Sequence, residues 1–279
     1  MEKFPEGRRL VESGVPQAEV LEARPASVEE LSLVHSSEYL AKIRQGTWTS
    51  SEAKKMGLPV DPLLFRRCAL EVGGTVLAGE AALTEGLSAN LGGGTHHAAQ
   101  NRASGYCILN DVAVAIRSLR KQRPDLWVMV IDTDAHQGDG THEIFCDDRR
   151  TFTYSIHVGP NFPSKKISGD MDVAVDRWTD GPRYLELLKP SLRKVLLDFE
   201  PDLVFWVAGA DIHREDRFGQ MGLSVTEIEE RNRFVLELVL EWSIPTAIVY
   251  GGGYNRDVSL TNHLHALPVL QAAALIDRK

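Results

Sequence analysis

The 279-residue chain contains few cysteines and no long apolar segment. Its three cysteines, Cys68, Cys107 and Cys146, are spaced too widely for a zinc finger or a disulfide framework, which favours a reducing compartment. No apolar run approaches the length of a membrane span. The N-terminal residues MEKFPEGRRLVESGV also lack the apolar segment of a signal peptide. We therefore expect a cytoplasmic protein with no membrane partner.

The chain also lacks an excess of basic residues. It has 31 lysines and arginines against 39 aspartates and glutamates, which gives a formal net charge of -8. Proteins that bind nucleic acids need a basic face, so this balance argues against a nucleic-acid partner. A basic peptide remains open as a substrate, because the charge of a cleft can differ from that of the average surface. The sequence leaves the oligomeric state open.

No repeat, low-complexity tract or linker divides the chain. The polar, turn-rich stretch 165–181 is too short to separate two domains, so we expect one α/β domain over residues 1–279. Strands are predicted at 87–91, 127–131, 152–156, 203–207 and 246–250. Helices are predicted at 108–121, 183–199, 224–242 (with Ser224 and Glu227 as a capping box) and 258–275. This alternation indicates βαβ units and a central, mostly parallel sheet flanked by helices.

Polar and glycine-rich segments follow four of the predicted strands. They read GGGTHHA, DTDAHQGDG, AGADIH and GGGYN. Ligands of open parallel sheets bind outside the carboxyl ends of the strands. The four segments therefore indicate one shared site. Neither glycine-rich segment is a phosphate-binding loop, because the Gly-Lys-Ser/Thr ending is absent.

A metal site is predicted after the strand 127–131, where carboxylates follow an apolar run without a break. Residues two apart on an extended segment point to the same side, so Asp134 and His136 can face one ion, with Asp211 as the third ligand. Two carboxylates and one imidazole leave a position open, as in catalytic zinc sites. Ligand type does not separate zinc from ferrous iron. The alternative is that these residues cap helices and bond to turn amides.

The same segments offer groups for acid–base chemistry. His96 and His97 each need a carboxylate to fix a tautomer, and Asp132 and Asp139 remain free for this. The hydroxyl of Tyr254 could donate to a developing oxyanion. The alternatives are an incidental histidine pair and a tyrosine packed at a helix start. Taken together, a metal-activated water, two oriented histidines and a hydroxyl donor suit the hydrolysis of an amide.

At this point the sequence resembles the histone deacetylase family. The resemblance rests on GGGTHHA, SGYCILNDVAVAI, VIDTDAHQGDG, YSIH, AGAD and GGGYN, which occur in the family order. As a whole it runs from near residue 1 to beyond residue 260. The variants DAHQGDG and GADIHREDRFG are most similar to the class IV branch and its bacterial relatives. The resemblance implies an arginase/deacetylase fold, usually with eight strands, and zinc-dependent removal of an acyl group from a lysine side chain.

The resemblance also implies roles for individual residues. It makes His97 the general base and acid, leaves His96 to tune charge, and has Tyr254 polarise the substrate carbonyl. It also implies that Asp134, His136 and Asp211 bind zinc, and that Asp132 and Asp139 are the carboxylate partners of the two histidines. The substrate residues are Gly105, which accepts the amide N–H, and Tyr106 and Phe162, the aromatic walls of the lysine tunnel. Potassium is implied at the backbone of Asp132, Asp134, His136, Ser155 and Ile156.

Two positions bear on the acyl group. Thr95 stands where many members of the family carry a bulky aromatic residue, which predicts extra volume beyond the metal. Phe218, seven residues after Asp211, should narrow only the mouth. The class IV branch is associated with long-chain deacylation. We therefore expect activity to rise from acetyl to longer acyl groups.

The resemblance begins inside the family pattern, so we expect the first strand of the family and a loop near the rim to be absent. Lysine deacylation of a protein is the leading function. The alternative is deacylation of acetylated polyamines or other small amides, and a polyamine enzyme would favour an acidic rim. A catalytically inactive acyl-lysine binding module is disfavoured, because the histidines, the ligands and Tyr254 are all present. Arginase-like chemistry would need a second metal.

Overall fold

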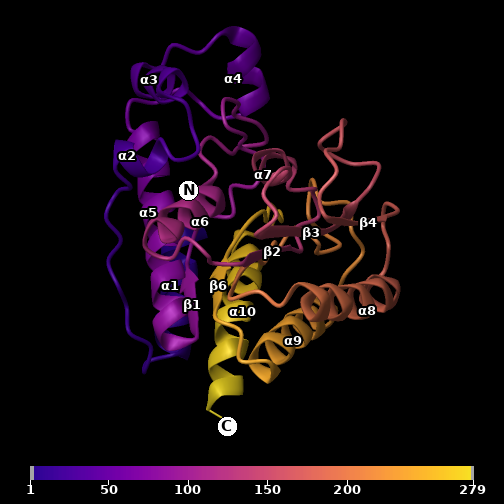
Figure 1. Ribbon diagram of the computed structural model, residues 1–279. Coiled ribbons are helices and arrows are strands. Elements are labelled where there is room, and N and C mark those ends of the chain that lie inside the picture. Colours follow the sequence, from indigo (N-terminus) through magenta and orange to yellow (C-terminus); the bar gives the residue numbers. More distant parts are fainter. Residues whose placement is uncertain (1–2, 278–279) are drawn as a thin grey trace.

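The computed structural model describes residues 3–277 as a single α/β domain built on one parallel sheet (Figure 1). Its six strands follow the order β1-β6-β5-β2-β3-β4, and each neighbouring pair is parallel. The strands are β1 (Leu87–Asn90), β2 (Val128–Asp132), β3 (Thr151–Val158), β4 (Met171–Val175), β5 (Leu203–Val207) and β6 (Thr246–Val249). The sheet is therefore fully parallel, as expected, but the eight strands implied by the family resemblance are wrong for the described residues.

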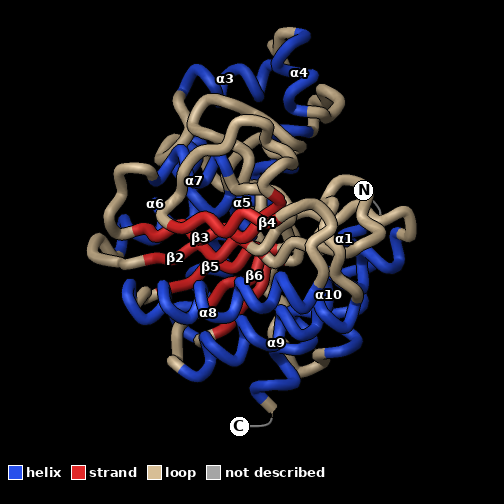
Figure 2. The backbone as a smooth tube through the Cα atoms, turned by 90° about the vertical axis from the view of Figure 1, so that its right-hand side faces the viewer, coloured by secondary structure: helices blue, strands red, loops and turns tan. Residues whose placement is uncertain are grey.

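Helices cover both faces of the sheet, and Figure 2 shows the strands between these layers. The first half of the chain forms α1 (Lys3–Gly14), α2 (Val28–Leu31), α3 (Ser37–Gln45), α4 (Ser50–Met56), α5 (Leu64–Glu85), α6 (Asp111–Gln122) and α7 (Asp139–Phe145). The second half forms α8 (Gly181–Phe199), α9 (Val225–Glu241) and α10 (Val258–Ile276). Within residues 3–277, none of the helices combines the length and the apolar character needed to cross a lipid bilayer.

The central strands are buried on both faces because their side chains alternate between two apolar layers. Val128 and Val130 of β2 pack with α5 and α6, whereas Met129 and Ile131 pack with α8, α9 and α10. A strand covered on both sides needs a continuous apolar run rather than an alternating one. This is why the sequence pattern located β2, β5 and β6 to within a residue.

The predicted elements differ from the observed ones mainly at polar positions. α6 begins at Asp111 rather than at 108, because the side chain of Asn110 accepts a hydrogen bond from Ala113 N and caps the helix. The capping box of Ser224 and Glu227 is present at the start of α9. The stretch 165–181 was predicted to be turns, but it contains β4. β4 is an edge strand with partly exposed residues, so it lacks the apolar run of a central strand.

Strand order brings the polar segments together. β2 pairs with β5, with Asp132 opposite Val207, and β5 pairs with β6, with Val207 opposite Val249. The segments after these three strands therefore start side by side at one edge of the sheet. The observed topology makes this edge the place for a shared site.

Candidate active site

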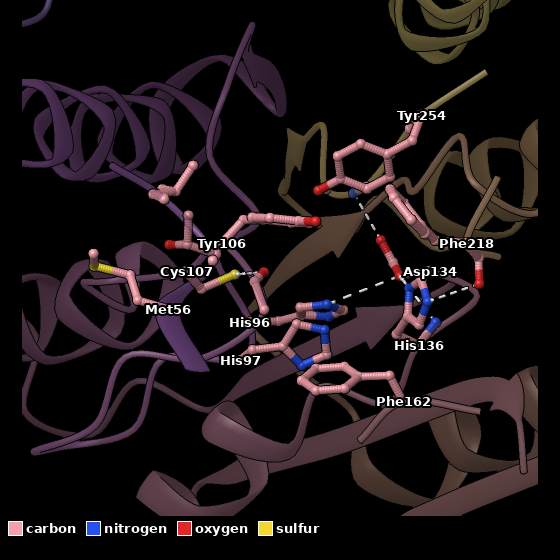
Figure 3. A pocket seen from close by; sticks show the side chains of 18 of the residues that line it. Met56, His96, His97, Tyr106, Cys107, Asp134, His136, Phe162, Phe218 and Tyr254 are labelled. Atoms are coloured by element: carbon pink, nitrogen blue, oxygen red, sulfur yellow. Dashed lines mark hydrogen bonds and ion pairs between the residues drawn. The ribbon is translucent and has the colours of Figure 1, made fainter. Parts of the chain in front are cut away.

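A cavity of about 1120 Å³ opens at the carboxyl ends of the strands. The segments GGGTHHA, DTDAHQGDG and GGGYN each contribute to its wall, and Figure 3 shows their side chains converging on one region. The predicted residues His96, His97, Asp134, His136 and Tyr254 all line it. Asp211 lies directly behind them and is fully buried.

The three predicted metal ligands are brought together. One ligand atom from each of Asp134, His136 and Asp211 lies within 4.8 Å of the others, and all three residues are buried. His136 Nδ1 lies 3.1 Å from Asp134 Oδ1 and 2.8 Å from Asp211 Oδ2. Asp211 Oδ2 nevertheless accepts no hydrogen bond of acceptable geometry within the described structure. A buried carboxylate oxygen in this position suits coordination of a cation.

The environment of His136 also fits a metal ligand. Its Nε2 lies 3.2 Å from the carbonyl oxygen of Phe218, so a hydrogen on Nε2 donates to that carbonyl. Nδ1 then carries a lone pair that faces two carboxylates. In metal-binding histidines, a hydrogen bond donated by the ring nitrogen that does not bind the metal commonly fixes the tautomer. Burial and the adjacent Asp134 carboxylate raise the pKa of Asp211 to about 8. A cation bound between the two carboxylates would offset this repulsion.

Glycines allow the backbone to approach these carboxylates. A Cβ atom on Gly252 would lie 2.6 Å from Asp211 Oδ2 and 2.8 Å from Asp134 Oδ2. The amide of Gly252 instead donates to Asp134 Oδ2 at 2.7 Å. On the other side, a Cβ atom on Gly209 would lie 2.6 Å from the Cα of Asp134. The glycines of AGAD and GGGYN thus form a tight cradle around the cluster.

Each histidine of the pair is bound to its predicted carboxylate. His96 Nδ1 lies 2.6 Å from Asp132 Oδ2, and His97 Nδ1 lies 2.7 Å from Asp139 Oδ1. Burial alone would lower the pKa of His96, but the carboxylates of Asp132 and Asp134 outweigh it and raise this pKa to about 9. Burial and the neighbouring His96 lower the pKa of His97 to about 4. The pKa values of the two imidazoles are therefore shifted in opposite directions, as expected of groups with different roles.

Tyr254 lies beside the mouth of the cavity, with its ring 5.6 Å from that of Tyr106 and 5.3 Å from that of Phe218. Its backbone amide donates to Asp216 Oδ2 at 2.5 Å, which fixes the end of the GGGYN segment. Burial raises the pKa of the Tyr254 hydroxyl well above its ordinary value. The hydroxyl therefore stays protonated and able to donate a hydrogen bond.

Aromatic side chains line the mouth. The exposed fractions of Tyr106, Phe162 and Phe218 are 41%, 40% and 40%, although each side chain is large and apolar. The Phe162 ring meets the His97 ring edge-on, with ring centroids 4.8 Å apart, so it packs directly against this histidine. A Cβ atom on Gly105 would lie 2.6 Å from the His97 ring and 2.8 Å from Phe162. Gly105 also has a φ of 51°, so a side chain there is excluded on both counts.

A sequence model of the histone deacetylase domain matches residues 7–268. The chain belongs to the histone deacetylase family. It is similar to the acetoin utilization protein AcuC of Staphylococcus xylosus, with 33% identity over 270 residues that cover 88% of this chain and 70% of its relative. An uncharacterized protein of Picosynechococcus sp. is 39% identical over 259 residues, covering 92% and 86% of the two chains.

The fold agrees with that assignment. The crystal structure of an HDAC homolog complexed with SAHA superposes with a TM-score of 0.83 at 26% identity, and covers 96% of this chain and 77% of that one. The present protein is therefore a hydrolase of the histone deacetylase family with the arginase/deacetylase fold.

The family motifs did not reveal which residues hold the loops of the candidate site in place. Arg231 is fully buried in α9, and its guanidinium donates to Thr133 O at 3.2 Å and to Gly209 O at 3.1 Å. It thus ties together the segments that carry Asp134 and Asp211. The only sequence signal for this role is an arginine on the apolar side of a predicted helix.

Thr95 lines the cavity as predicted, and its hydroxyl also forms a hydrogen bond within the protein. Its Oγ1 lies 2.6 Å from Asp111 Oδ1, and its backbone amide donates to the same oxygen at 2.7 Å. The Asp111 carboxylate also accepts from Gly94 N at 2.9 Å. Asp111, another residue that the sequence reasoning missed, therefore holds the loop that carries the histidine pair.

The potassium positions stay a prediction. Asp132 and Ser155 lie opposite each other in the pairing of β2 and β3, with Ile156 next along β3. The segment of Asp134 and His136 follows β2 directly. The five predicted residues are thus neighbours.

Proposed function

We propose that this protein is a zinc-dependent deacylase that hydrolyses the amide bond of N-ε-acyl-lysine. The observation that carries the proposal is the buried cluster of Asp134, His136 and Asp211 beneath two carboxylate-bound histidines. These three side chains would hold the metal. Zinc is the first candidate and ferrous iron the alternative, because both accept this set of ligands. The same family resemblance supports potassium at the backbone near Asp132 and Ser155.

The metal, when bound, lowers the pKa of water and polarises the substrate carbonyl. His97 acts as the base because its low pKa keeps Nε2 free to accept a proton from the attacking water. Asp139, bonded to Nδ1, stabilises the imidazolium that forms. The protonated His97 then returns the proton to the departing lysine amine. Atoms balance, because water supplies the hydroxyl of the acid product and the hydrogen of the amine.

Two further groups act on the developing negative charge. Tyr254 keeps its hydroxyl proton and donates it as a hydrogen bond to the oxyanion. His96, whose pKa is about 9, adds a positive charge beside the reacting atoms. Losing one such donor typically costs about a hundred- to a thousand-fold in turnover.

The remaining groups orient the substrate. The aromatic rings of Tyr106 and Phe162 would enclose the apolar stem of the lysine, and Phe218 would narrow the mouth. The carbonyl of Gly105 would accept the substrate amide N–H. Thr95 would lie beside the acyl group. Orientation of this kind can supply a large part of the rate enhancement.

The test is a hydrolysis assay with purified, metal-loaded protein. The substrates are acyl-lysine peptides, an acetylated polyamine and a simple acetylated amine, with metal content measured by elemental analysis. We expect the peptides to be hydrolysed most efficiently, chelation to abolish activity and zinc to restore it. SAHA, the compound bound by the related HDAC homolog, should inhibit. Hydrolysis of only the polyamine, or full activity in metal-free protein, would contradict the proposal.

A further inference from the structure

The charge at the mouth of the cavity is opposite in sign to the charge of the whole protein. The chain has a formal net charge of -8. Among the described residues, the lysines, arginines and acidic residues that line the cavity are Lys54, Lys55, Asp61, Arg67, Glu71, Asp134 and Arg217. Asp134 belongs to the metal cluster, and Arg67 and Glu71 pair with each other at 4.0 Å. The mouth is therefore left with three cations and the single carboxylate of Asp61.

The two lysines are fixed next to the aromatic wall. They lie in the last turn of α4, and the backbone carbonyl of Lys55 accepts a hydrogen bond from Gly105 N at 3.1 Å. The next carbonyl, that of Met56, accepts from Tyr106 N at 2.9 Å. A Cβ atom on Gly57 would lie 2.8 Å from the Tyr106 ring. The end of α4 is thus attached to the same backbone that forms one wall of the mouth.

Both lysine side chains are available to a ligand. Lys54 and Lys55 are exposed, and neither forms an ion pair with another residue of the described chain. The one acidic residue of α4, Glu52, is already bound to Lys42 at 2.5 Å. Its carboxylate also caps the helix start at Thr49. No carboxylate of α4 therefore neutralises these two ammonium groups.

Arg217 carries the third cation, on the segment that also carries Phe218. Its Nε donates to the carbonyl of Tyr254 at 3.0 Å, and its guanidinium lies over the Phe218 ring at 5.2 Å. These contacts hold an exposed arginine beside the tunnel and leave its other donors available. The rings of Tyr106 and Phe218 lie 6.4 Å apart, so the two sources of positive charge are on neighbouring parts of the mouth.

We propose that the mouth selects acyl-lysines that have acidic residues beside them in a peptide or protein. This rests on the proposed deacylase function and names its substrate class. Carboxylates on either side of the bound lysine would meet Lys54, Lys55 and Arg217, which carry the opposite charge. The same cations repel an acetylated polyamine, whose remaining amines are positive. The mouth therefore disfavours the small cationic substrates that an acidic rim would attract.

The experiment uses three acyl-lysine peptides of equal length, flanked by glutamates, glutamines or lysines. We expect KM to be lowest for the glutamate peptide and highest for the lysine peptide, with roughly a 1.5- to fivefold change for each flanking charge. The turnover number should change little, because the charges act outside the reacting atoms. High salt should reduce the differences, since exposed charges are screened.

Charge reversal at the mouth is the decisive variant. The double substitution Lys54→Glu and Lys55→Glu should invert the order of KM among the three peptides. The matched control is Arg149→Glu with Arg233→Glu, which changes the net charge equally at two exposed residues that do not line the cavity and form no ion pair within the described chain. This control should keep the wild-type order.

Two outcomes would contradict the inference in different ways. If the wild-type enzyme hydrolyses all three peptides with equal KM at low salt, or if the α4 variant keeps the wild-type order, the charge selection is refuted and the deacylase function stands. If no acyl-lysine peptide is hydrolysed, the proposed function fails and this inference fails with it.

Discussion

The length of the acyl chain offers the sharpest test of how the cavity is built. Beyond the histidines the cavity is lined by Met56, Cys68, Cys107 and Ile108, all buried and apolar. Burial raises the pKa of the Cys68 thiol to about 12, so this side chain stays neutral. An acyl chain that enters this region exchanges water for apolar contacts.

The expected gain follows from the area removed from water. Each buried methylene contributes about 0.8 kcal/mol, which corresponds to roughly a fourfold increase in kcat/KM. The gain should end where the chain meets the ion pair of Arg67 and Glu71, which lines the same cavity from α5. Placing methylenes against these charges would remove water from them at a cost. We therefore expect kcat/KM to rise from acetyl to medium-length chains and then to level off.

The assay measures kcat/KM for lysine peptides carrying acetyl, butyryl, octanoyl and dodecanoyl groups. Cys68→Phe should reduce the octanoyl-to-acetyl ratio by filling the inner cavity, while Cys68→Ser should largely keep it. Overpacking typically costs about 1–3 kcal/mol, so the Tm of both variants must be measured. Thr95→Trp should act in the same direction, but it also removes the hydroxyl that donates a hydrogen bond to Asp111. A wild-type enzyme that prefers acetyl to butyryl and octanoyl would refute this reasoning.

Four further outcomes are expected. Tyr254→Phe should lower turnover by about a hundred- to a thousand-fold with unchanged metal content, and wild-type turnover would make the tyrosine a packing residue. His97→Ala should cost about a hundred- to ten-thousand-fold and His96→Ala less, so the reverse order in steady-state assays would overturn their roles. Asp211→Ala should lose both the metal, by elemental analysis, and the activity, and retention of both would exclude it as a ligand. His35 is 1% exposed, and burial lowers its pKa to about 4 from the usual 6.5. The stability that it contributes, about 3 kcal/mol, is complete above pH 6.5 and is lost as the pH falls through 4. Chemical denaturation between pH 7 and 4 should show this loss and His35→Gln should reduce it, whereas identical profiles would exclude the assignment.

The fold could be predicted where burial is simple. β5 has the predicted bounds because all five of its residues are buried, and an apolar run of that length between turns is characteristic of a central strand. β4 was missed because it is the edge strand of the sheet. Its residues are partly exposed and include polar ones, so they form no continuous apolar run. The start of α6 was predicted at residue 108 because apolar residues precede Asn110. The helix itself begins only after Asn110, which caps it. Hydrophobic pattern thus reports the interior of the sheet better than its borders.

The site could be predicted as a set of residues but not as an arrangement. Spacing related Asp134 to His136, since both follow one strand. It could not show that Phe218 O orients the His136 ring, or that Arg231 joins the segments after β2 and β5. The His136–Phe218 contact joins residues 82 positions apart, and the Arg231–Thr133 bond joins residues 98 positions apart. Contacts between residues so distant in the sequence cannot be predicted from a local pattern.

The sequence by itself determined the parallel α/β class and the deacetylase family, and it named the residues of the candidate site, because these depend on local patterns and on motifs at strand ends. Only the tertiary structure decided the charge of the mouth. The net charge of -8 says nothing about where Lys54, Lys55 and Arg217 lie. Their meeting depends on α4 bonding to the segment of Gly105 and on Arg217 packing against Phe218. Charges that are distant along the chain act together only once folding has placed them around one opening.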